Sequence, residues 1–312
     1  MIATFESILP IFLLIVAGNL LRHVPLVDAR AWPGLEQLGF WFLYPALLFV
    51  TIVNADFSAL NLDTLVISLA AAIGAMIVLA LCLWPPLNAS GLVARSEFSS
   101  VFQTTIRWNG FMAFAIAQKL FEPEGLAVVA LVMAAIIMPI NIASIAVIVR
   151  FGSSRADWGG VARKTATNPL VLASLAALIV RAQPYGFYEP FNQTLDLVGR
   201  AALGMGLIAI GAGLRPADLW QPRVAMWLPV VLKLAVYPAI LIGTAVAMGL
   251  SGPQLTYLAL CGAVPTAMNG YLLARQMGGD AELYAAVTTM QTIISFFSIP
   301  AVLAIAAMLA GA

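Results

Sequence analysis

Two Asn-Gly pairs, Asn109-Gly110 and Asn269-Gly270, lie within long apolar stretches of the chain. Glycine inside a helix costs about 1 kcal/mol relative to alanine, and asparagine competes for backbone hydrogen bonds. Pro265 adds a missing N–H and a ring clash shortly before the second pair. We therefore predict that the chain is unwound at both pairs. In a membrane such segments must line a cavity or be buried in protein, because their free N–H and C=O groups need partners.

Three cations are predicted deep within apolar stretches: Arg107, Arg200 and Lys233. Two interpretations of Arg107 are open. Its guanidinium binds a carboxylate bidentately, or it faces a water-filled vestibule. For Lys233, substrate contact and neutralisation of the exposed carbonyl ends of a broken helix are equally good interpretations. Arg200 is expected to pair with Asp196 at i, i+4. Because no Asp or Glu is comparably deep, these cations favour an anionic substrate, although backbone carbonyls can still bind sodium.

The elements that position these residues are predicted to be membrane-spanning helices. Of 312 residues 62% are hydrophobic and only 9% are charged, against about 25% charged in soluble domains. Each crossing takes about 20 residues, so no room remains for an extramembrane domain. Ten apolar stretches predict spans over residues 5–21, 35–53, 64–84, 99–121, 126–149, 169–180, 190–214, 224–249, 254–273 and 283–309. The fold class is therefore an all-α polytopic membrane protein.

Several function classes are excluded or disfavoured. The chain has no G-x-x-x-x-G-K-[ST] phosphate loop, so a primary pump is unlikely. A net charge of +1 gives no basic surface for nucleic acid. The single histidine, His23, and two cysteines in apolar runs, Cys82 and Cys261, indicate no metal site or catalytic triad. We expect no enzyme activity, no cofactor and no metal.

Basic residues favour one orientation. The loops that follow odd-numbered spans contain Arg22, Arg30, Arg95, Arg150, Arg155, Arg163, Lys164, Arg215, Arg223 and Arg275. The opposite loops contain only Lys119 and Arg181, near span ends. By the positive-inside rule, both termini are expected outside the cytoplasm. Residues 1–7 contain no basic residue ahead of the first apolar stretch, so an uncleaved first span is expected.

The chain divides into two similar halves, residues 1–150 and 169–312, joined by a polar cytoplasmic connector at 151–168. The Asn-Gly pair recurs in the fourth span of each half, and Pro139 and Pro300 recur at nearly the same offset in the fifth. Because five is odd, the second half must enter the membrane from the opposite face. Inverted repeats with interrupted helices at corresponding positions are typical of transporters that bind substrate near the midplane.

Motifs along nearly the whole chain resemble the auxin efflux carrier family, which includes bacterial malonate and other organic-acid carriers and the plant auxin exporters. They are Leu9-Pro10 with Gly18, Tyr44-Pro45-Ala46-Leu47, Asn109-Gly110, Asn168-Pro169, Gly211-Ala212-Gly213-Leu214, Lys233 with Pro238, Pro265-Thr266 with Asn269, and Pro300. Two positions depart from the family pattern: span four has no proline at its break, and Gly204 stands where the seventh helix often carries proline. The long central loop of the plant exporters is absent.

The resemblance implies a fold like that of the bile-acid symporters, with two inverted five-helix repeats and crossed broken helices 4 and 9. It implies a scaffold of helices 1, 2, 6 and 7, a transport domain of helices 3–5 and 8–10, and a homodimer. A carboxylate substrate would bind near Asn109 and Asn269. From the residues alone, the glycines of span seven indicate close helix packing; they are Gly199, Gly204, Gly206, Gly211 and Gly213.

These observations predict a secondary transporter or uniporter in the cell inner membrane, which moves a small organic anion. The family resemblance implies that it does so by an elevator motion. The residues expected at the substrate site are Asn109, Asn269, Arg107, Gly110, Pro265, Thr266, Gly270 and Lys233. One alternative is a sodium-coupled symporter of a larger amphipathic anion on the same fold. The other is an intramembrane sensor or enzyme, which is disfavoured because no Asp pair, Ser-His pair or metal cluster lies at depth.

Overall fold

The computed structural model describes residues 2–24, 27–58, 60–151, 159–160, 163, 166–183, 187–216 and 223–311. Within these residues every regular element is a helix. Most of the predicted connector at 151–168 lies outside the described residues. The fold class predicted from composition, an all-α membrane protein, is confirmed.

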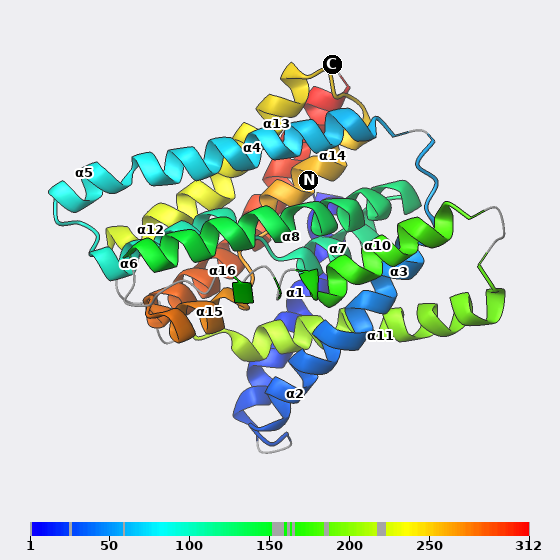
Figure 1. The fold of residues 1–312 in the computed structure, drawn as a ribbon, viewed down its shortest axis with the longest axis horizontal. Coiled ribbons are helices and arrows are strands. Elements are labelled where there is room, and N and C mark those ends of the chain that lie inside the picture. The colour runs from blue at the N-terminus through cyan, green and yellow to red at the C-terminus, as the bar shows by residue number, and fades with distance from the viewer. Residues whose placement is uncertain are drawn as a thin grey trace.

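The helices follow one another with few long loops (Figure 1). In chain order they are α1 (Ile2–His23), α2 (Ala31–Leu38), η1 (Gly39–Leu43), α3 (Tyr44–Asn54), α4 (Leu62–Cys82), α5 (Trp84–Ala89), α6 (Arg95–Ile106), α7 (Gly110–Leu120), α8 (Pro123–Phe151), α10 (Pro169–Arg181), α11 (Glu189–Gly213), α12 (Val224–Val231), η3 (Leu232–Val236), α13 (Tyr237–Ala247), α14 (Pro253–Ala263), α15 (Gly270–Met277) and α16 (Ala281–Ala310).

Among the described residues, seven helical stretches are long and apolar enough to cross a membrane. They are Thr4–His23, Ala31–Asn54, Leu62–Ala89, Pro123–Phe151, Glu189–Gly213, Val224–Ala247 and Ala281–Ala310. The other three of the ten predicted spans form shorter helices, because the fourth is divided into α6 and α7, the ninth is divided into α14 and α15, and α10 has only 13 residues. The chain is thus a multi-pass membrane protein with seven candidate spans.

Two membrane-spanning stretches contain a π-helical turn directly before a Tyr-Pro pair. In η1 the N–H of Tyr44 bonds to the carbonyl of Gly39, and in η3 the N–H of Tyr237 bonds to that of Leu232. The following prolines have no N–H and would clash with the carbonyl four residues back. One wider turn lets each helix continue past its proline, as single π-turns do inside α-helices.

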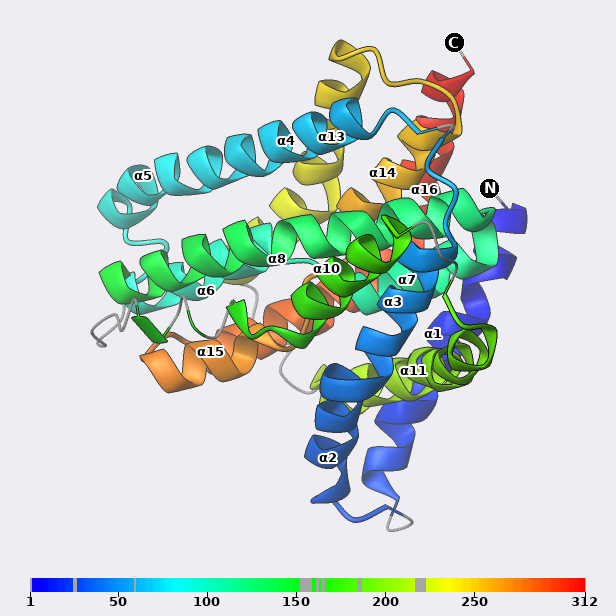
Figure 2. The same ribbon diagram turned by 45° about the vertical axis from the view of Figure 1, so that its right-hand side comes forward.

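The helices pack in two groups. Helix α11 contacts α1 and α3, and α3 also contacts α10, whereas α4, α6, α7, α8, α12, α13, α14 and α16 are linked by contacts of their own. The two groups also touch, because α1 contacts α7 and α16, and α3 and α10 contact α8. Figure 2 shows α1–α3 and α11 together below, with α4 and α8 above them. Between the groups, the ring of Tyr44 stacks on that of Phe111, with centroids 3.4 Å apart and planes at 15°.

Helices α1 and α11 approach so closely that glycine is required on both. A methyl group at Gly211 would overlap the backbone oxygen of Ile15, and one at Gly18 would overlap that of Ile208. The prediction of close packing is confirmed at Gly211, and also at Gly199 and Gly206, which face Leu47 and Tyr44. An added Cβ would make an ordinary contact with Met268 at Gly213 and would have nothing within 4 Å at Gly204, so neither position is closely packed within the chain.

Candidate functional site

The two helix interruptions meet in the structure. Helix α6 ends at Ile106 and α7 begins at Gly110, while α14 ends at Ala263 and α15 begins at Gly270. The backbone N–H of Asn109 donates a hydrogen bond of 2.7 Å to the carbonyl of Pro265. Residues from distant parts of the chain therefore share one irregular region, in which backbone groups released from the helices pair with each other.

The two asparagines play different parts in this region. Asn109 is 2% exposed, and its side-chain Oδ1 accepts the N–H of Met112 at 3.1 Å, so it caps α7. Asn269 occupies the equivalent position before α15 but makes no capping bond with its side chain, which is exposed. Its amide is therefore free to bind another molecule.

Helix α16 holds the second interruption in place. The N–H of Thr266 donates to Oε1 of Gln291 at 2.9 Å, and its hydroxyl lies 3.3 Å from that of Tyr284. The hydroxyl of Tyr284 donates to the carbonyl of Ala267 at 2.6 Å. The irregular backbone after Pro265 is thus fixed by two side chains from one helix.

Gln291 also links this segment to two other helices. Its Nε2 donates to the carbonyl of Thr104 in α6 at 2.9 Å and to that of Pro229 in α12 at 3.0 Å. Gln291, Tyr284 and Asn141 were not predicted from the sequence, because they carry no charge and lie outside the repeated Asn-Gly motif. The available signal was a lone amide within the apolar sequence of α16, since an unpaired amide there would cost several kcal/mol.

The glycines of the two Asn-Gly pairs make room for neighbouring side chains. A Cβ at Gly110 would lie 3.0 Å from Sδ of Met133, and one at Gly270 would overlap the hydroxyl of Tyr284. Close packing against Met133 and Tyr284 therefore explains why glycine occupies these two positions. The structure shows no direct role for their atoms in binding.

Comparison with known proteins shows which family part of the chain resembles. Residues 158–303 match a family model described as a membrane transport protein. Over these residues the chain is similar to the auxin efflux carrier family. The match includes Lys233, Pro265, Thr266, Asn269 and Gly270 and leaves Arg107 and Asn109 outside. A search of curated proteins found no match.

The family is one of membrane transporters and not of enzymes. Arg107 is only 6% exposed, and its Nη2 donates to Oδ1 of Asn141 at 2.9 Å. The buried polar side chains of the described residues include no Asp or Glu. The guanidinium charge of Arg107 therefore lies at depth beside a neutral amide.

The two other predicted cations, Lys233 and Arg200, have protein partners. Lys233 is fully buried in η3, and its Nζ donates to the carbonyl of Gly262 at 3.3 Å and lies 4.1 Å from the ring centroid of Tyr237. The charge of Lys233 thus neutralises the carbonyl end of α14, which is one of the two roles that the sequence suggested for this residue. Nε of Arg200 contacts Oδ2 of Asp196 at 2.7 Å, which confirms the predicted pair.

A further cation lies beside Tyr271. Nη2 of Arg215 donates to the hydroxyl of Tyr271 at 3.4 Å, and the backbone N–H of Arg215 donates to the hydroxyl of Thr289 at 3.0 Å. Positive charge therefore lies at Tyr271, two residues after Asn269 in the sequence. Sequence reasoning counted Arg215 only as a loop charge.

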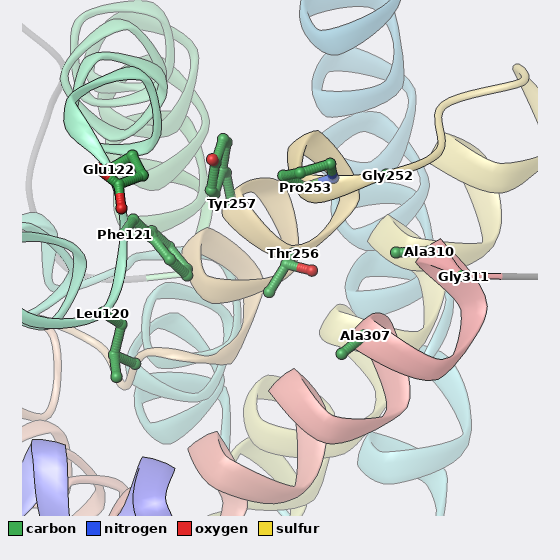
Figure 3. Close-up of a pocket in the computed structure, with 10 residues that line it drawn as sticks. All are labelled: Leu120, Phe121, Glu122, Gly252, Pro253, Thr256, Tyr257, Ala307, Ala310 and Gly311. Atoms are coloured by element: carbon green, nitrogen blue, oxygen red, sulfur yellow. The ribbon is translucent and has the colours of Figure 1, made fainter.

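The protein also has a pocket of about 470 Å³ at a different place (Figure 3). It lies between the end of α7, the start of α14 and the end of α16, and none of the predicted site residues lines it. Its lining combines the rings of Phe121 and Tyr257, 4.7 Å apart, with the carboxylate of Glu122. An acidic, aromatic lining does not suit an anion.

Substitutions of two tyrosines test whether the hydroxyl of Tyr284 stabilises the second interruption. Tyr284→Phe is expected to lower the free energy of unfolding by about 1–3 kcal/mol, because the carbonyl of Ala267 loses its donor. Tyr44→Phe is the matched control, since the buried hydroxyl of Tyr44 has no hydrogen-bond partner. It is expected to leave stability unchanged or raise it. Thermal unfolding of the purified variants measures the difference, and equal effects would contradict the assignment.

Proposed function

We propose that the chain is a secondary transporter or uniporter that moves a small organic anion, a mono- or dicarboxylate of malonate or auxin type, across the cell inner membrane. The observation that carries the proposal is the meeting of the two helix interruptions at the bond between Asn109 and Pro265. Beside it lie the exposed amide of Asn269 and the buried charge of Arg107, which no buried carboxylate in the described part of the chain neutralises.

The site we propose binds a carboxylate at the starts of α7 and α15. Helix N-termini carry partial positive charge, and broken helices direct it towards anionic groups in transporters. Asn269 supplies a free amide and Arg107 a further donor. Thr266 contributes by fixing the backbone of the second interruption, since its N–H bonds to Gln291 and its hydroxyl contacts that of Tyr284. Gly110, Pro265 and Gly270 shape the backbone around the anion, and Lys233 acts indirectly by stabilising the end of α14.

The repeat architecture is part of the proposal. Each half contains two short helices separated by an interruption and followed by a long helix: α6, α7 and α8 in residues 1–150, and α14, α15 and α16 in residues 169–312. This shared order of elements supports two inverted repeats whose broken helices cross.

Transport then proceeds by an elevator motion. The scaffold comprises α1–α3, α10 and α11, the transport domain comprises the other helices, and the stacked rings of Tyr44 and Phe111 lie between them. A cross-link that joins position 44 to position 111 is expected to abolish uptake while preserving substrate binding. Full uptake by the cross-linked protein would contradict the motion. A homodimer and termini outside the cytoplasm complete the proposal.

The amide of Asn269 provides the most direct test of the site. Asn269→Ala is expected to leave the melting temperature of the unliganded protein within about one degree, because the side chain makes no capping bond and is exposed. It is expected to remove the stabilisation that a carboxylate ligand confers on the folded state. Melting temperatures of purified protein with a panel of carboxylates measure both quantities.

Asn109→Ala serves as the comparison variant. It loses a helix cap, which costs about 0.5–2 kcal/mol, so its melting temperature should fall even without ligand. If Asn269→Ala retained the full ligand-induced shift and wild-type uptake in liposomes, the proposed site would be wrong. Uptake that requires sodium would favour the symporter alternative.

A further inference from the structure

A group of buried polar atoms between α6 and α8 has no hydrogen-bond partner. The unpaired atoms are Nε2 and Oε1 of Gln103, Nε of Arg107 and Oγ of Ser144. Gln103 and Ser144 are fully buried, and Arg107 is 6% exposed. Buried polar groups are paired in the great majority of cases, so a cluster of unpaired ones indicates a site for a bound ion or water.

The register of the two helices places these atoms at two neighbouring levels. Arg95 donates to the carbonyl of Arg150 and Arg107 donates to Asn141, so α6 and α8 run antiparallel. Gln103 lies one turn before Arg107, and Ser144 lies almost one turn after Asn141. Residues three or four apart share a helix face. Gln103 and Ser144 therefore lie at one level of the interface, about one turn from the level of Arg107 and Asn141.

The charge of the cluster distinguishes an anion from water. The guanidinium of Arg107 is buried, its one protein partner in this cluster is the neutral amide of Asn141, and none of the buried side chains in the described ranges is a carboxylate. A buried charge without a counter-charge costs several kcal/mol. Water would satisfy the hydrogen bonds and leave the charge uncompensated. A small anion would accept from Arg107, Gln103 and Ser144 and also neutralise the charge.

We propose that Gln103, Arg107, Asn141 and Ser144 form a small-anion site between α6 and α8, adjacent to the first helix interruption. The site binds a halide or a compact carboxylate. Gln103 and Ser144 are uncharged ligands of this anion. The inference rests on the proposed function in one respect, because Arg107 belongs to both sites. It differs in its ligands and in its place on the α6 side of Asn109.

Thermal unfolding of the purified protein tests the site. The protein is kept in a buffer whose only anion is a bulky sulfonate, and chloride or formate is added in increasing concentration. The melting temperature of the wild type is expected to rise and saturate, because a ligand that binds only the folded state stabilises it. In Gln103→Leu the half-saturating concentration is expected to rise about tenfold or more, as for loss of a bond to a charged group.

Ser144→Ala is expected to weaken the anion effect in the same direction. Its matched control is Ser174→Ala, because the hydroxyl of Ser174 is equally buried but already donates to the carbonyl of Leu170. Without added anion, Gln103→Leu should melt at or above the wild-type temperature, since it removes an unpaired amide. The melting temperature measured without anion therefore shows whether a lost anion effect comes from lost binding or from lost folding.

The outcomes separate this site from the proposed function. A chloride-induced shift that is absent in Gln103→Leu supports the anion site even where no carboxylate binds. A formate shift that persists in Gln103→Leu and disappears in Asn269→Ala overturns the site and leaves the proposed function standing. No shift with either anion, or an equal shift in Gln103→Leu, Ser144→Ala and Ser174→Ala, also overturns the anion site.

Discussion

Gly211→Ala is expected to destabilise the protein by about 1–3 kcal/mol or more, the range for overpacked cores. The added methyl group would overlap the backbone oxygen of Ile15, and a backbone atom cannot rotate away. Helices α1 and α11 would have to separate, which also disturbs the bonds from Asn19 to the carbonyls of Gly211 and Leu214. The better helix propensity of alanine offsets only about 1 kcal/mol of this cost.

Gly204→Ala is the matched control on the same helix. Nothing lies within 4 Å of an added Cβ at Gly204, so this variant should keep or gain stability. The measurement is the melting temperature of the two purified variants, together with the yield of folded protein. Equal melting temperatures for Gly211→Ala and Gly204→Ala would show that α1 and α11 tolerate separation.

The sequence predicted the helical class and the interrupted region because both follow from local chemistry. Long apolar stretches can cross a membrane only as helices in a chain of this composition. Asn-Gly and a nearby proline disfavour a helix wherever they occur, and the helices do break beside Asn109 and Asn269. The pairing of Arg200 with Asp196 needed only the i, i+4 spacing.

The remaining features depend on contacts between distant residues, which local patterns do not encode. The different roles of Asn109 and Asn269 arise from their neighbours and not from the shared Asn-Gly motif. The same holds for Lys233, whose charge is directed to the carbonyl of Gly262. Gly204 and Gly211 look alike in the sequence of α11, yet only Gly211 faces a backbone atom of α1.

Gln291→Leu is expected to be the most damaging substitution near the interruptions. Leucine fills a similar volume but leaves the N–H of Thr266 and the carbonyls of Thr104 and Pro229 without the partner that Gln291 supplies. Each unpaired buried group costs about 1–3 kcal/mol. The combined loss is comparable with the whole stability of many proteins, about 5–15 kcal/mol, so little folded protein should accumulate.

Thr292→Val separates this effect from a general sensitivity of α16. Thr292 is the next residue and is equally buried, but its hydroxyl bonds only to the carbonyl of Thr288 in its own helix. This variant should fold and transport nearly as the wild type does. In the Gln291→Leu protein that does fold, amide hydrogen exchange should accelerate at Thr266, whose N–H has lost its acceptor. Unchanged exchange there would mean that another group replaces the amide, and α16 would then not be what holds the second interruption against the first.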